Sequence, residues 1–158
     1  MIPAQTLALT LSDEAATCAL AAALASRVRR GDVIGLSGPL GSGKTTFARA
    51  FIAARSGTGE VPSPTFTLVE VYDSLTGPAV WHFDLYRLEK PEDVYELGFE
   101  DALAEGISLI EWPERLGSLM PAEHLTVILI PGAKETERKA ELRPSPSWAE
   151  RIAGLRRG

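Results

Sequence analysis

The alternation of apolar and polar residues predicts short strands that alternate with helices. Strands are predicted at residues 5–11, 33–36, 67–72, 79–84, 106–111, 124–130 and 135–142. Helices are predicted at residues 12–30, 47–54, 91–97, 100–103 and 147–155. The last two strands look antiparallel, whereas helices separate several of the earlier strands. This order predicts a three-layer α/β domain with a central mixed, largely parallel β-sheet.

The first predicted helix has clear signals at both ends. Ser12 is a candidate N-cap, with Asp13 and Glu14 in the first turn, and Gly31 is a plausible stop after Arg30. Its alanines and leucines recur at helical spacing, which is typical of a helix that packs closely on a sheet. Its N-terminal residues could reach a ligand only if the fold brings them there.

The stretch between the second strand and the second helix carries the strongest chemical signal. Gly38 to Thr45 fits the pattern G-x-x-x-x-G-K-[ST], in which backbone N–H groups and a helix N-terminus surround phosphate. Lys44 supplies an ammonium for the terminal phosphates, and Thr45 supplies the hydroxyl that such loops place on Mg²⁺. A P-loop NTPase-like domain is therefore expected to bind a nucleoside triphosphate through Gly38, Leu40, Gly41, Ser42, Gly43, Lys44, Thr45 and Thr46.

Two later strands each end in a carboxylate, Asp84 and Glu111. In P-loop proteins an acid at the end of a neighbouring strand holds Mg²⁺, and a second acid can ligate the metal or orient water. Both residues qualify for either role, and the assignment stays open.

His82 lies on the same face of its strand as Asp84. It is expected to be a hydrogen-bonded packing residue or to support a neighbouring site residue, and a zinc site is not expected because no cysteine or second histidine lies nearby.

Residues 61–66 contain two prolines that keep the segment extended. Thr65 is a candidate sensor of the γ-phosphate within such a shaped loop. A rigid connector before the next strand explains the same residues equally well.

Composition limits the class of protein. The 158 residues, 45% of them hydrophobic, are enough for one good core, so a single domain over residues 1–158 is expected. The only cysteine, Cys18, excludes an internal disulfide and a cysteine-rich metal site. A net charge of −5 argues against direct binding to DNA or RNA.

No apolar run has the length of a membrane span, which favours a cytoplasmic protein without a membrane partner. The basic residues near the C-terminus, Arg151 among them, are expected to be solvated.

Four motifs in order resemble the TsaE (YjeE) family. They are residues 38–47 (GPLGSGKTTF), 63–69 (SPTFTLV), 82–88 (HFDLYRL) and 110–113 (IEWP), and the resemblance runs from about Leu11 to Ile130. It implies a bacterial ATPase that uses ATP and Mg²⁺ and is required for threonylcarbamoyladenosine modification of tRNA next to the anticodon. The implied partners are the TsaD and TsaB proteins, with tRNA contacted only through their complex.

The resemblance also implies roles for single residues. Lys44 and Thr45 would bind phosphate and Mg²⁺, Asp84 would act as the second acid, and Glu111 would contribute to the metal site or to hydrolysis. Thr65 would belong to a switch-like loop. Trp112 would lie near the nucleotide, and Glu14 and Thr17 would approach its adenosine.

The leading functional hypothesis is an ATPase with weak activity alone that is stimulated by, and cycles on, the TsaD–TsaB complex. A small-molecule kinase and a nucleotide-ordered binding module remain alternatives. A GTP-dependent switch is disfavoured, because a chain without asparagine cannot carry the guanine-reading N-K-x-D pattern.

Overall fold

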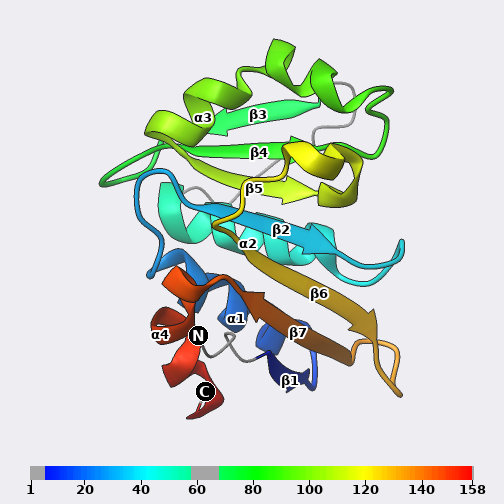
Figure 1. Ribbon diagram of the computed structural model, residues 1–158. Coiled ribbons are helices and arrows are strands. Elements are labelled where there is room, and N and C mark those ends of the chain that lie inside the picture. Colours follow the sequence, from blue (N-terminus) through cyan, green and yellow to red (C-terminus); the bar gives the residue numbers. More distant parts are fainter. Residues whose placement is uncertain (1–5, 58–67, 158) are drawn as a thin grey trace.

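The computed structural model describes residues 6–57 and 68–157, and these contain one mixed seven-stranded sheet (Figure 1). The strand order is β1-β7-β6-β2-β5-β4-β3. The strands are β1 (Leu7–Leu11), β2 (Val33–Ser37), β3 (Val69–Tyr72), β4 (Val80–Asp84), β5 (Ile107–Glu111), β6 (Leu125–Pro131) and β7 (Arg138–Pro144).

The centre of the sheet is parallel and its flanks are antiparallel. Strands β6, β2, β5 and β4 pair in parallel, whereas β1, β7 and β3 join through antiparallel pairs. The carboxyl ends of the four central strands therefore meet at one edge. In open α/β sheets, ligands bind at this edge.

Helices cover both faces of the sheet, which confirms the three-layer α/β prediction. The α-helices are α1 (Glu14–Ala25), α2 (Lys44–Ser56), α3 (Phe99–Glu105) and α4 (Pro146–Ala153). The 3₁₀ segments are η1 (Pro91–Leu97), η2 (Pro113–Leu119) and η3 (Gly154–Arg157). Among the described residues, none of the helices has both the length and the apolar character that a membrane span requires.

A separate apolar core fills the space on each side of the sheet. On one side α1, α2 and α4 pack on the sheet, and Phe47 and Phe51 of α2 are fully buried there. On the other side Phe83 of β4 contacts Phe99 of α3 edge to face, with ring centroids 5.7 Å apart. Successive residues of β4 thus point to opposite cores, as the alternation predicts, so His82 and Asp84 face the side of α2.

Three predicted boundaries are wrong by three residues or more, and one of them is the start of the second helix, which begins at Lys44 and not at residue 47. The first helix ends at Ala25 and not near Arg30, because the N–H of Ser26 closes the last turn and the following residues form a turn around Asp32. The last strand begins at Arg138 and not at 135, because residues 132–137 form a turn in which the backbone N–H of Gly132 donates to the carbonyl of Glu137 and that of Glu137 donates to the carbonyl of Lys134. The predicted helix at residues 91–97 is a 3₁₀ segment.

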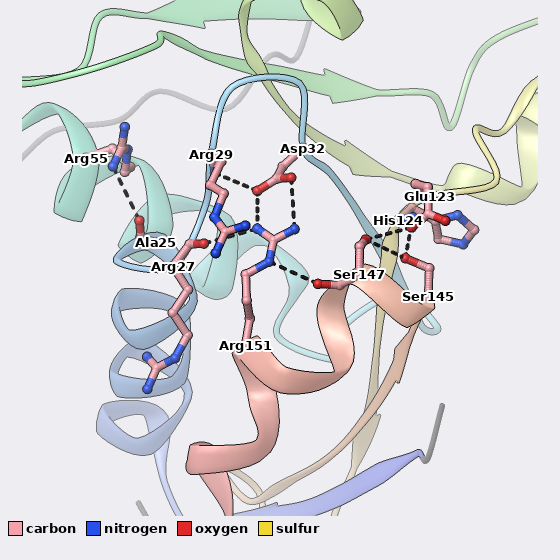
Figure 2. Close-up of polar contacts among 10 residues, drawn as sticks. All are labelled: Ala25, Arg27, Arg29, Asp32, Arg55, Glu123, His124, Ser145, Ser147 and Arg151. Atoms are coloured by element: carbon pink, nitrogen blue, oxygen red, sulfur yellow. Dashed lines mark hydrogen bonds and ion pairs between the residues drawn. The ribbon is translucent and has the colours of Figure 1, made fainter. Parts of the chain in front are cut away.

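Arg151 is also not solvated as predicted. Figure 2 shows its side chain reaching from α4 to the carboxylate of Asp32, just before β2. Nη1 lies 2.5 Å from Oδ2 and Nη2 lies 3.2 Å from Oδ1, and the two side chains are only 11% and 13% exposed. The guanidinium also donates to the carbonyl of Arg27 and stacks 3.9 Å from the ring centre of Trp148. This network attaches the C-terminal helix to the α1–β2 connection.

We expect Arg151→Met to lower the free energy of unfolding by about 3 kcal/mol, because it leaves the largely buried Asp32 carboxylate without its counter-ion. Urea unfolding measures the change. Arg143→Met is the matched control, since Arg143 pairs with Glu141 at the surface and such pairs contribute about 0 to 1 kcal/mol. Equal losses in the two variants would contradict the assigned role of Arg151.

Candidate functional site

The loop between β2 and α2 has the backbone shape that its glycines permit. Gly38, Gly41 and Gly43 have φ of 138°, 77° and 98°, values that other residues rarely adopt. A Cβ on Gly38 would also collide with the carbonyl oxygen of Leu129 in β6. The sequence motif therefore forms a tight loop at the carboxyl end of β2, directly before the N-terminus of α2.

Lys44 is the first residue of α2 and is buried at the centre of the site. Its Nζ donates to the carbonyl oxygen of Gly38 at 2.5 Å and lies 3.4 Å from the ring centre of Trp112. Burial lowers the pKa of Lys44, an effect opposed by the carboxylates of Glu111, Glu114 and Asp84. The ammonium is thus held between a carbonyl, an aromatic face and nearby acids.

The two strand-end acids lie side by side, because Asp84 of β4 is the register partner of Glu111 of β5. Oδ1 of Asp84 accepts the N–H of Tyr86 at 3.2 Å, and Oε2 of Glu111 lies 2.7 Å from Nε2 of His82. Burial is the main cause that raises the pKa of Asp84, and Glu111 adds to it, whereas the N–H of Tyr86 opposes it. The fold therefore brings both acids to the loop that holds Lys44.

Trp112 follows Glu111 and has a strained backbone. Its φ of 61° makes it the one non-glycine residue with positive φ in the described part of the chain. Its backbone N–H donates to the carbonyl of Leu36 in β2. The centre of its ring lies 5.0 Å from the ring centre of Tyr86. Backbone strain of this kind concentrates at functional sites. It places the indole beside Lys44.

A cavity of about 440 Å³ opens at this edge of the sheet. Nine of the predicted residues line it: Leu40, Gly41, Gly43, Lys44, Thr45, Thr46, Asp84, Glu111 and Trp112. Gly38 and Ser42 are absent from its wall. Gly38 holds Lys44 through its carbonyl, and Ser42 is buried, with no hydrogen-bond partner for Oγ among the described residues. Thr65 lies outside the described residues.

The N-terminal part of α1 lies next to this cavity. A smaller hollow of about 40 Å³ is lined by Glu14 and Thr17 together with Gly43 and Thr46 of the loop and helix. The N-cap of α1 is Asp13 and not Ser12 as predicted, because Oδ1 of Asp13 accepts the backbone N–H of Ala16 at 2.8 Å. The fold thus meets the condition under which the N-terminal residues could reach a ligand. Their contact with adenosine stays a prediction.

The sequence reasoning missed Arg138, and it also did not place Leu68 and Tyr86 in this cavity. Arg138 lines both hollows, and its Nη2 donates to the carbonyl of Gly41 at 3.3 Å. Its Nη1 donates to the carbonyls of Glu135 and Glu137, and its buried Nε has no partner within residues 6–57 and 68–157. It lies 94 residues beyond Lys44 in an unremarkable segment. Only the pairing of β6 with β2 and β7 would have located it.

The fold and the glycine-rich loop define a P-loop NTPase-like α/β protein. Residues 11–140 match the family described as "Threonylcarbamoyl adenosine biosynthesis protein TsaE". The chain therefore belongs to the TsaE family, as its motifs predict.

Similar proteins agree with this assignment, and a solved structure agrees with the fold. The protein named "tRNA threonylcarbamoyladenosine biosynthesis protein TsaE" from Rickettsia conorii is 43% identical over 112 residues, which cover 70% of this chain and 63% of that protein. The protein of the same name from Bacillus subtilis is 36% identical over 72% of this chain and 70% of its own length. The match thus spans less than two thirds of the Rickettsia conorii relative. The crystal structure of YdiB from Bacillus subtilis superimposes with a TM-score of 0.77 at 25% identity, covering 97% of this chain and 95% of that one.

We expect Asp84→Asn to be more stable than the wild type at neutral pH. In the folded protein the pKa of Asp84 lies above its ordinary value of 3.8, so the native state binds more protons in that interval and stability falls as pH rises through it. The variant lacks this loss but keeps an oxygen for the N–H of Tyr86. Urea unfolding of the apo protein at about pH 3 and about pH 7 tests this, with the difference expected only at the higher pH. A difference of equal size at both would contradict it.

Proposed function

We propose that this chain binds ATP with Mg²⁺ at the cavity beside the β2–α2 loop and hydrolyses it. The proposal depends above all on one observation, the convergence of Lys44, Asp84 and Glu111 on that cavity. Phosphoryl transfer needs chiefly positioning and charge stabilisation. A buried ammonium, loop N–H groups and a helix N-terminus supply positive charge for phosphate oxygens. Glu111 or Asp84 would orient the attacking water.

The residues present fit Mg²⁺ held jointly with a nucleotide. Within the described residues, no group of three or more His, Cys, Asp and Glu side chains is placed to hold a metal. Mg²⁺ commonly takes one or two carboxylates and completes its octahedral shell with phosphate oxygens and water. Thr45, Asp84 and Glu111 would hold it in this way, and Mg²⁺ would neutralise charge on the phosphates. Nε of Arg138 is buried and has no hydrogen-bond partner among the described residues, and Arg138 lines the cavity, which favours an anionic ligand at the same place.

The other proposed contacts extend along the same edge. Glu14 and Thr17 would approach the adenosine, Trp112 would lie beside the nucleotide, and Thr65 would respond to the γ-phosphate. The remaining backbone and side-chain contacts would come from the loop residues Gly38, Leu40, Gly41, Ser42, Gly43 and Thr46.

The biological role that we propose is threonylcarbamoyladenosine modification of tRNA next to the anticodon, in the cytoplasm. Family membership supports the pathway. We propose TsaD and TsaB as the partners, with weak ATP hydrolysis by the chain alone and faster hydrolysis on their complex. The net charge of −5 favours contact with tRNA through that complex over direct binding.

The first test is steady-state hydrolysis of ATP and GTP by the purified chain, alone and with TsaD, TsaB and tRNA. We expect slow ATP turnover that rises with the complex, and poor use of GTP. Lys44→Ala should lower turnover at least about 100-fold, because it removes a charge that stabilises the transferring phosphate. Lys90→Ala, at an exposed lysine, is the control. Unchanged turnover in Lys44→Ala would contradict the proposed site. Fast turnover without partners would favour a kinase, and intact bound ATP after long incubation would favour a binding module.

Arg138→Met should weaken ATP binding by about 10- to 100-fold, since hydrogen bonds to a charged group contribute about 1.5 to 3 kcal/mol. Titration with a fluorescent ATP analogue measures the dissociation constant, and Arg138→Lys should recover part of the affinity. An affinity equal to that of the wild type, in a folded variant, would show that Arg138 only shapes the turn before β7.

A further inference from the structure

The side chain of His82 is buried beside the proposed site and is not among the residues that line the cavity. His82 is 3% exposed, and its Nε2 lies 2.7 Å from Oε2 of Glu111. Both side chains are almost fully buried, with exposed fractions of 4% and 8%. The contact joins two adjacent strands, β4 and β5, immediately behind the wall of the cavity.

The register of the two strands explains the contact. Asp84 is opposite Glu111, and His82 is opposite Leu109, so the imidazole lies one pleat behind the Glu111 carboxylate on the same face of the sheet. A short ring on a central strand has little freedom, whereas a glutamate side chain has three rotatable bonds. A hydrogen bond from His82 therefore fixes a carboxylate that would otherwise have several orientations.

Only one oxygen of Glu111 is used by this bond. Among the described residues, no hydrogen bond reaches Oε1, and Glu111 lines the cavity. One oxygen is thus anchored to the sheet while the other stays available. Asp84 has the same arrangement, with Oδ1 anchored by the N–H of Tyr86. Preorganised carboxylates of this kind are what a metal or an oriented water requires.

The surroundings of the ring select its tautomer. Nδ1 of His82 is buried without a partner in the described part of the chain. A buried N–H without an acceptor is costly, so the proton belongs on Nε2, where the Glu111 carboxylate accepts it. His82 is therefore a donor to Glu111 through a fixed atom.

We propose that His82 is a positioning residue that orients the Glu111 carboxylate toward Mg²⁺ in the nucleotide complex. The inference depends on the proposed function, because it assigns a task to Glu111 there. His82 touches neither nucleotide nor metal in this scheme. It acts through one hydrogen bond across the β4–β5 pair.

Three variants test it by Mg²⁺-dependent nucleotide binding, which does not require turnover. The amide nitrogen of His82→Gln can occupy the place of Nε2, whereas that of His82→Asn reaches only the place of Nδ1, and His82→Phe removes the donor but keeps a ring. A fluorescent ATP analogue is titrated in EDTA and again over a range of Mg²⁺ concentrations. Leu109→Val is the matched control, since it perturbs the register partner of His82 without removing a polar contact.

We expect His82→Asn and His82→Phe to need about 10-fold more Mg²⁺ or more for tight binding, with binding in EDTA unchanged. His82→Gln and Leu109→Val should stay near the wild type. Wild-type Mg²⁺ dependence in folded His82→Asn and His82→Phe would overturn the proposal and leave His82 as a packing residue. Should Phe prevent folding, the Asn and Gln pair decides alone, and equal Mg²⁺ dependence in the two overturns it.

A second measurement uses the unmodified chain. Nitrogen-15 spectra of the histidine rings should show His82 protonated at Nε2, with its signal shifting when Mg²⁺ and the ATP analogue bind together. Protonation at Nδ1 in place of Nε2 would overturn the proposal. A wild type that binds the analogue in neither condition would instead overturn the proposed function, a result that the His82 variants alone cannot produce.

Discussion

The site depends on the parallel pairing of β2, β5 and β4. This pairing places Leu36, Glu111 and Asp84 in neighbouring register positions, so that the loop leaving β2 and the two acids meet at one edge. A slip of one residue between β4 and β5 would turn Asp84 into the opposite core and separate the acids. Buried residues on both faces of these strands hold the register in place.

Burial gives the site its chemical character. It shifts the pKa of Lys44 downward and that of Asp84 upward, toward the neutral form in each case. Lys44 and the acids partly offset this by their mutual attraction, and the indole of Trp112 adds a favourable contact for the ammonium. An anionic ligand bound together with a cation would offset the rest of the cost of burying these charged groups. Charged groups that are buried in this way are common at functional sites.

The sequence predicted the features that are encoded locally. The loop from Gly38 to Thr45 is a contiguous pattern, and Asp84 and Glu111 are marked by their places at strand ends. The three-layer fold followed from the order of elements. Arg138 and the hydrogen bond from His82 to Glu111 could not be predicted, because they depend on strand order and register, which no short window contains. The first helix was predicted to be too long because Arg151, more than 100 residues away, holds the turn around Asp32 that follows it.

The length of the turn between β6 and β7 determines where Arg138 lies relative to the loop. The backbone hydrogen bonds from Gly132 to Glu137 and from Glu137 to Lys134 fix how many residues separate the two strands. They thereby fix the point at which Arg138 lies beside the loop. A single inserted residue there would leave every recognisable motif intact and still carry the guanidinium away from the cavity. The length of one short connection is thus as necessary to the site as any side chain in it, although its own residues have no chemistry to mark them.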